Sequence, residues 1–176
     1  MREKFGRGLL AAFIIGGILC IPRACKAAES GDTYLSADIV KICETAQEKY
    51  NIAAPLLEAL IETESSGKQY AKTDTSVGYC QLNVKYQYAL ALSEMGTSSV
   101  DLYDAETNIY TACAYLNQLI EELDAEGEPL QVLRAYNRGP EAAQTKYMNV
   151  FEYGDYANKV LNRADEITRA QEGKEK

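Results

Sequence analysis

A helical spacing of apolar residues recurs along most of this chain and constrains it to an all-helical fold. The clearest case lies between Asp104 and Gly127, where apolar residues return every three or four positions and form one stripe. Asp104 is a favourable residue to begin this helix and Gly127 a favourable one to end it. Residues 68–83 are polar and lack the period, and we expect a loop or a short β excursion there. Similar helical patterns occupy residues 36–51, 55–67, 84–96, 129–137 and 156–167.

The first 27 residues differ in character from the rest. Residues 1–7 are rich in basic side chains and residues 8–21 are apolar without a charge, which is typical of an export signal. This stretch is shorter than the ~20 residues that a free-standing membrane span needs, so a cleaved signal is favoured over an uncleaved anchor. We expect an exported protein, either secreted or anchored to the outer face of the cytoplasmic membrane. We interpret residues 28–35 as a linker, 36–170 as the folded domain and 171–176 as a charged tail.

The charge of the folded part argues against one class of partner. The chain has 18 basic and 26 acidic residues. Residues 1–27 contain five of the basic residues and one of the acidic residues. The remainder therefore has 13 basic and 25 acidic residues and a net charge of −12. Such a domain repels phosphate groups, and binding to nucleic acid is therefore disfavoured.

The sequence contains no histidine, which narrows the chemistry further. Ser-His-Asp and Cys-His nucleophilic sites are excluded, and the usual zinc ligands are missing, so we expect neither a metal nor another cofactor. Cys43, Cys80 and Cys113 have no metal-type spacing; one disulfide could form, but three small buried hydrophobic residues are favoured. Carboxylates remain as the groups that could perform catalysis.

Three glutamates lie on the helix predicted from Pro55, and the helical period separates them. Glu64 continues the apolar stripe, whereas Glu58 and Glu62 are four residues apart and share a different face. Only Glu64 is therefore predicted to be desolvated. A carboxyl group in an apolar setting has a raised pKa and can stay protonated near neutral pH, as a general acid requires. The alternative is a glutamate that only borders the core at a helix end.

Glu64 belongs to one of three segments whose order resembles the catalytic domain of the soluble lytic transglycosylases, the goose-lysozyme-like enzymes that cleave bacterial cell wall. Glu-Ser at 64–65 is similar to the catalytic pair of the family, and Gly-Tyr-Cys-Gln-Leu at 78–82 resembles its Gly-Leu-Met-Gln loop. Ala-Tyr-Asn-Arg-Gly-Pro at 135–140 is close to its Ala-Tyr-Asn-Ala-Gly-Pro. Weaker matches lie in 108–116 and 156–161, so the resemblance spans roughly residues 52–161.

The resemblance implies that the glycan strands of peptidoglycan are the substrate and that Glu64 is the single catalytic acid and base. It would cleave the bond between N-acetylmuramic acid and N-acetylglucosamine and leave a 1,6-anhydromuramyl end. Each role has a structural alternative: Gln81 would hold its own loop, Asn137 would cap a helix, and the tyrosines would pack in the core. The substrate-binding residues implied by the resemblance are Ser65, Gly78, Tyr79, Gln81, Tyr136, Asn137 and Tyr156, with Tyr136 and Tyr156 beside the carboxyl group.

The chain departs from the family pattern in two of its motifs. Tyr79 and Cys80 replace Leu-Met, and Arg138 places a cation at the rim of the expected groove. In the loop that follows Ser65, the candidate equivalents of the family's polar residues are Thr73, Thr75 and Ser76.

Two other functions stay open from the sequence alone. A lysozyme of the same fold would use water and a second carboxylate, for which Asp74 is the local candidate. A glycan-binding module would have the same fold and bind the glycan without cleaving it. A lytic domain without wall-anchoring repeats would also suit an enzyme that opens the wall for a secretion, conjugation or phage machine. The sequence does not select among these three.

Overall fold

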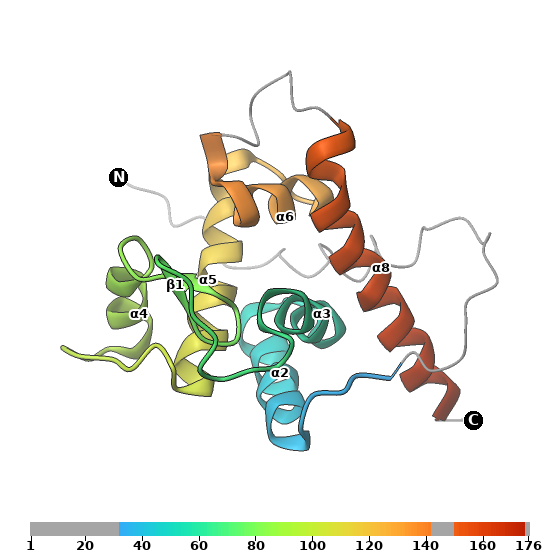
Figure 1. Ribbon diagram of the computed structural model, residues 1–176, viewed down its shortest axis with the longest axis horizontal. Helices are drawn as coiled ribbons and strands as arrows, with labels where there is room; N and C mark the ends of the chain where they lie inside the picture. The colour runs from blue at the N-terminus through green and yellow to red at the C-terminus, as the bar shows by residue number, and fades with distance from the viewer. Residues whose placement is uncertain (1–31, 142–149, 175–176) are drawn as a thin grey trace, which may run out of the picture.

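The computed structural model describes residues 32–141 and 150–174, so the predicted signal or anchor lies outside the described residues. Within these ranges the chain forms six helices and one two-stranded sheet, and the prediction of an all-helical fold is confirmed (Figure 1). The helices are α2 (Ala37–Tyr50), α3 (Ala54–Ser65), α4 (Tyr88–Met95), α5 (Ala105–Leu123), α6 (Pro129–Arg138) and α8 (Val150–Lys174). Antiparallel strands β1 (Ser76–Val77) and β2 (Leu82–Asn83) pair Ser76 with Asn83. No described helix is long and apolar enough to cross a membrane.

Capping residues explain where most of these helices begin and end. Asp104 precedes α5, and its carboxylate accepts a hydrogen bond of 2.9 Å from the backbone N–H of Thr107. Pro55 lies in the first turn of α3, where its missing N–H is not needed. Gly96 ends α4 with a positive φ of 63°. These ends follow the predictions closely because each depends on a local residue preference.

Some details of the predicted helices differ from the structure. Helix α5 ends at Leu123, before Gly127, because Asp124 adopts a left-handed conformation. Helix α4 begins at Tyr88, because the preceding residues form turns after β2. Ser36 stands at the N-cap of α2, but its side chain makes no capping hydrogen bond. Residues 171–174 continue α8, and so the part of the predicted charged tail that is described is helical.

Helix α3 is the central element of the fold. It packs against α2 on one side and α8 on another (Figure 1). Nine of its 12 residues are buried, so it has no solvent-facing side on which a glutamate could stay hydrated. Glu58 is 0% exposed and Glu62 is 7% exposed, and both are more buried than Glu64. The prediction that Glu64 alone is desolvated is therefore wrong, because it assumed a helix with one polar face.

The segment before α2 is fastened to α3 and α8. The Thr33 hydroxyl and the Tyr34 backbone N–H both donate to Oε1 of Glu62, at 2.8 and 3.2 Å. Arg163 of α8 donates from Nε to Oε2 of Glu62 at 2.6 Å and from Nη2 to the carbonyl of Asp32 at 2.7 Å. Residues 32–35, the described end of the predicted linker, thus form a strap over the helix pair, which we call the N-terminal strap.

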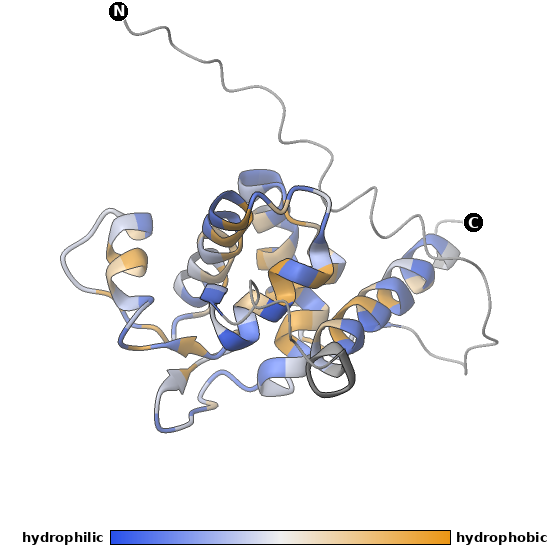
Figure 2. Ribbon diagram, turned by 90° about the horizontal axis from the view of Figure 1, so that it is seen from above, coloured by the Kyte–Doolittle hydropathy of each residue, from blue (hydrophilic) through white to orange (hydrophobic). Residues whose placement is uncertain are grey.

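The apolar core lies between the helices, where Figure 2 shows hydrophobic segments facing inward and hydrophilic ones outward. Cys43, Cys80 and Cys113 are all buried free thiols within it. Burial raises the pKa of each thiol above its usual range, which keeps them protonated and unreactive. The interpretation of these three residues as small hydrophobic core residues is confirmed.

Candidate active site

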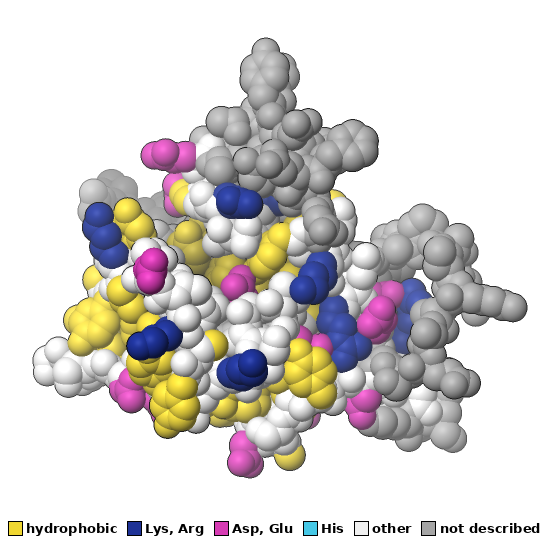
Figure 3. Space-filling model, in the orientation of Figure 1, with side chains coloured by type: hydrophobic (Ala, Val, Ile, Leu, Met, Phe, Trp, Pro, Cys, Tyr) yellow, Lys and Arg dark blue, Asp and Glu magenta, His cyan; other side chains and the backbone are white. Residues whose placement is uncertain are grey.

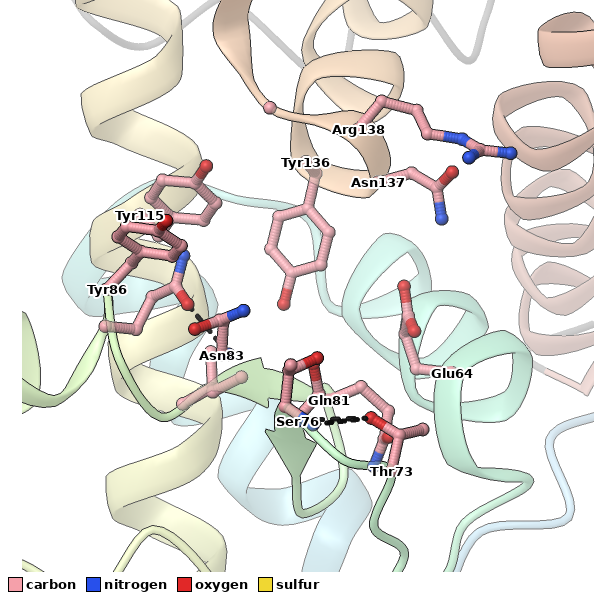
Figure 4. Close-up of a pocket in the computed structure, with 14 residues that line it drawn as sticks. Glu64, Thr73, Ser76, Gln81, Asn83, Tyr86, Tyr115, Tyr136, Asn137 and Arg138 are labelled. Carbon is pink, nitrogen blue, oxygen red and sulfur yellow. Dashed lines mark hydrogen bonds between the residues drawn. The ribbon is translucent and has the colours of Figure 1, made fainter.

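A polar pocket of about 420 Å³ lies where the end of α3 faces the β hairpin, α5 and the end of α6 (Figure 4). Glu64 is the only carboxylate among the described residues that line it. The lining consists of Glu64, Thr73, Thr75, Ser76, Gln81, Leu82, Asn83, Tyr86, Gln87, Tyr115, Tyr136, Asn137, Arg138 and Gly139.

Glu64 occupies the last turn of α3, and its side chain points toward the end of α6, where Asn137 and Tyr136 project (Figure 4). Burial raises the pKa of this carboxyl group. A hydrogen bond from the Tyr156 hydroxyl and the charge of Lys159 act in the opposite direction but do not cancel the effect of burial. Glu64 is therefore a carboxyl group that holds its proton more strongly than an exposed glutamate does.

Two tyrosines from different helices contact the floor of the pocket. The Tyr156 hydroxyl of α8 donates to Oε1 of Glu64. The Tyr136 hydroxyl of α6 donates to the carbonyl of Cys80 at 2.8 Å, which connects α6 to the loop after β1. Burial raises the pKa of both phenols above the usual range, so both act as hydrogen-bond donors.

A buried asparagine holds the loop that joins β1 to β2. Oδ1 of Asn108 accepts from the backbone N–H of Cys80 at 2.7 Å, and its Nδ2 donates to the carbonyl of Leu102 at 2.7 Å. Gly78 has φ of 81°, and a Cβ atom at this position would lie 2.1 Å from Nδ2 of Asn108. The loop can pack this closely on α5 only because residue 78 is a glycine.

Gln81 lines the pocket from this loop with a positive φ of 49°. Its Nε2 donates to the carbonyls of Ala71 and Gly78, at 3.1 and 2.9 Å. The side chain thus holds the loop, and Oε1 is the atom that a ligand donor could approach.

The structure brings together five of the eight predicted site residues. Gln81, Tyr136 and Asn137 line the pocket with Glu64, and Tyr156 contacts Glu64 from α8. The other three predicted residues do not line the pocket. Ser65 is buried and donates its hydroxyl to the carbonyl of Ile61 at 3.1 Å, Gly78 packs on Asn108, and Tyr79 is 8% exposed. Their positions favour a structural role.

The pocket also contains residues that the sequence did not single out as site residues. Asn83 is the last residue of β2, Tyr86 and Gln87 come from the turns after it, and Tyr115 comes from α5, within one of the weaker family-like segments. Thr73, Thr75, Ser76 and Arg138 line it as the sequence suggested, whereas Asp74 is exposed and outside the lining. Among the described residues, no group of histidine, cysteine, aspartate or glutamate side chains could hold a metal ion.

Comparisons with known proteins bear on the fold and the family of this chain. A lytic transglycosylase Slt from Pseudomonas aeruginosa, solved as an inactive mutant, is similar with a TM-score of 0.58 and 16% identity. The match covers 75% of this chain and 24% of that chain, so this chain spans about a quarter of its length and the likeness concerns the fold. No curated protein matches the chain. The model of the family described as the Transglycosylase SLT domain matches residues 41–158. Since this match covers more than half of the sequence, the chain belongs to the Transglycosylase SLT domain family.

Proposed function

We propose that this chain is a peptidoglycan lytic transglycosylase that cleaves the β-1,4 bond between N-acetylmuramic acid and N-acetylglucosamine. Family membership and the fold of the Pseudomonas aeruginosa lytic transglycosylase support the proposal. The observation that carries it is the isolation of Glu64, a desolvated carboxyl group without a second carboxylate in the described lining of its pocket.

In the first step, Glu64 acts as general acid. Its proton moves to the glycosidic oxygen, the bond between that oxygen and the muramyl anomeric carbon breaks, and the N-acetylglucosamine side leaves as an alcohol. The raised pKa of Glu64 suits this step because the group must still hold its proton when substrate arrives. The acetamido oxygen of the substrate stabilises the positive charge at the anomeric carbon.

In the second step, the Glu64 carboxylate acts as general base. It removes the proton of the muramyl 6-hydroxyl while that oxygen bonds to the anomeric carbon, which closes a 1,6-anhydro ring and restores the acid. A nucleophile that is already part of the bound sugar has a high effective concentration, so a protein nucleophile is not required. The hydrogen bond from Tyr156 stabilises the carboxylate that exists between the two steps.

The remaining polar groups of the pocket suit an amide-bearing sugar. Asn137 offers an amide donor and acceptor at the end of α6, and Gln81 offers an acceptor at Oε1. Tyr86 and Tyr115 supply aromatic faces on the side of the pocket away from Glu64 (Figure 4). Together these groups can hold an N-acetylated sugar with its glycosidic oxygen toward Glu64.

A hydrolase that uses water is the main alternative. Such an enzyme typically places its two carboxyl groups ~5–10 Å apart on opposite sides of the bond. The sequence candidate for the second group, Asp74, is exposed and lies outside the described lining. This position favours the transglycosylase over the hydrolase.

We also propose that the chain acts outside the cytoplasm, where its substrate lies. The basic residues 1–7 and the apolar residues 8–21 support export, with either cleavage or retention as an anchor.

Mass spectrometry of the products from purified peptidoglycan tests the proposed reaction. An anhydro product is lighter by one water than its hydrolysed counterpart, and we expect fragments at the anhydro mass. Fragments at the hydrated mass would show a hydrolase, and Asp74→Asn would then be the variant to examine. No fragments from the folded protein would favour a glycan-binding module without turnover.

A further inference from the structure

A second pocket, of about 550 Å³, lies beside the catalytic one between the end of α3, α8 and the N-terminal strap. We call it the strap pocket. Its lining consists of Tyr34 of the strap, Glu62, Thr63 and Ser66 at the end of α3, and Asn158, Lys159, Asn162, Arg163 and Glu166 of α8. Its lining is polar, and nothing in the proposed cleavage reaction uses it.

The strap pocket begins next to the catalytic carboxyl group. Thr63 lines it, and the next residue in the chain, Glu64, lines the catalytic pocket. Lys159 lines the strap pocket, and its charge lowers the pKa of Glu64, so the two side chains are close. Lys159 also follows Tyr156, the partner of Glu64, by less than one helical turn. A ligand bound at Glu64 could therefore extend a branch into the strap pocket.

The side chains of this pocket match a peptide that carries a carboxylate. Asn158 and Asn162 are exposed, one turn apart on the same face of α8, and their amides can pair with peptide groups. Arg163 is already bound to Glu62 and Glu166, whereas Lys159 forms no salt bridge within the described residues. Lys159 is therefore the cation available to a carboxylate, in a domain that is otherwise acidic. Figure 3 shows basic and acidic side chains side by side on the face of the molecule turned toward the viewer.

Much of this pocket lies outside the part of the chain that the family model matches. The match ends at residue 158 and begins at residue 41, so Tyr34, Lys159 and Asn162 all fall in the flanks. The strap itself is held by Glu62 and Arg163, which fixes Tyr34 as a wall. The N-terminal strap thus adds Tyr34 to a pocket whose α8 wall begins in the segment 156–161 that resembles the family.

We propose that the strap pocket binds the peptide stem of the muramyl residue whose glycosidic bond Glu64 cleaves, with Lys159 bound to a stem carboxylate. This inference rests on the proposed function. The stem is attached to the lactyl group of the same sugar that reacts, so it must leave the catalytic pocket close to Glu64. The strap pocket is in that position, and it would make cleavage sensitive to the presence of the stem.

The test compares intact glycan, which carries stems, with the same glycan after an amidase has removed them. Asn162→Asp keeps the shape of the side chain and adds a negative charge that repels a stem carboxylate. Gln118→Glu is the matched control, because Gln118 is exposed on α5 and lines neither pocket. We expect the ratio of kcat/KM on intact to stem-free glycan to fall about tenfold in Asn162→Asp, the effect of losing about 1.4 kcal/mol of binding. The same ratio should not change in Gln118→Glu.

A ratio that is equal in wild type and Asn162→Asp would overturn the proposal, provided thermal melting shows both folded. If the wild type cleaves neither glycan, the proposed function fails. Titration of the protein with the free stem peptide then tests whether the strap pocket binds the stem. In that titration, followed by NMR, we expect the side-chain amide signals of Asn158 and Asn162 to shift and the signal of Gln118 to stay. Unmoved signals of both asparagines would contradict stem binding.

Discussion

The Tyr156 hydroxyl donates a hydrogen bond to Oε1 of Glu64 across 92 positions of the sequence and joins α8 to the end of α3. This bond favours the carboxylate, whereas burial favours the protonated acid. In the proposed reaction the two influences oppose each other at one group that gives a proton and then takes one. Their balance would then set the pH range of activity.

Replacing Tyr156 with phenylalanine tests this balance. The variant loses the bond that stabilises the carboxylate, so the pKa of Glu64 should rise and the loss of activity on the alkaline side should move to higher pH. We expect the maximal rate to fall about tenfold, because the intermediate carboxylate is less stable. A kcat profile against pH measures both effects. Tyr115→Phe, which changes a tyrosine of the same pocket that has no bond to Glu64, should keep the position of the alkaline limb.

Glu64→Gln should remove activity while keeping the fold. The amide cannot donate a proton to the glycosidic oxygen, and loss of general acid catalysis costs roughly 10²–10⁴ in rate. The free energy of unfolding should be equal or higher, since a buried ionisable group is replaced by a neutral one of the same shape. Turnover of purified peptidoglycan and urea unfolding give the two quantities. Activity within about tenfold of the wild type would exclude Glu64 as the acid.

Glu62→Gln should act in the opposite way, with its main effect on stability. Glu62 is buried and binds Arg163, Thr33 and Tyr34, so the change leaves a partly buried guanidinium with only its exposed partner, Glu166, as counter-charge. Breaking such a pair should cost roughly 1–3 kcal/mol. Urea unfolding measures the loss. Glu166→Gln, which removes the exposed partner of the same arginine, should cost no more than about 0.5 kcal/mol. Equal losses in the two variants would refute the role assigned to Glu62.

Glu58 should make stability depend on pH. It is fully buried, and burial raises its pKa from 4.5 to about 7. The folded chain then binds this proton more tightly than the unfolded chain, so the stabilisation is complete below pH 4.5 and is lost as pH rises toward about 7. Glu58→Gln should be more stable than wild type at about pH 8, by on the order of 2 kcal/mol, and closer to it at about pH 5. A constant difference at both pH values would contradict this assignment.

Local residue preferences allowed much of the fold to be predicted. Asp104, Pro55 and Gly96 fix helix ends through interactions within one or two turns, and the structure has helix boundaries at or next to them. The choice of Glu64 also came from sequence, since its motif and its place on the helix selected the glutamate that lines the pocket.

Long-range enclosure could not be predicted in the same way. The period of α3 suggested a polar side at Glu58 and Glu62, but α8 and the N-terminal strap cover that side. These elements lie far away in sequence, and a helical period carries no information on them. Asn83 and Tyr86 were missed for a similar reason, because the paired strands and the turns after them decide which loop residues face Glu64.

The burial of α3 also has a consequence for which residues of this chain can be substituted during evolution. Backbone amides in a fully enclosed helix exchange with solvent only when much of the domain unfolds, whereas the exposed residues around β1 and β2 can exchange through local openings. The proposed proton donor is thus carried by the part of the chain least tolerant of substitution, whereas some of the proposed sugar contacts, such as Gln81 and Tyr86, come from a more tolerant part. Glycan preference can therefore drift through loop changes while the position of the proton donor stays constant.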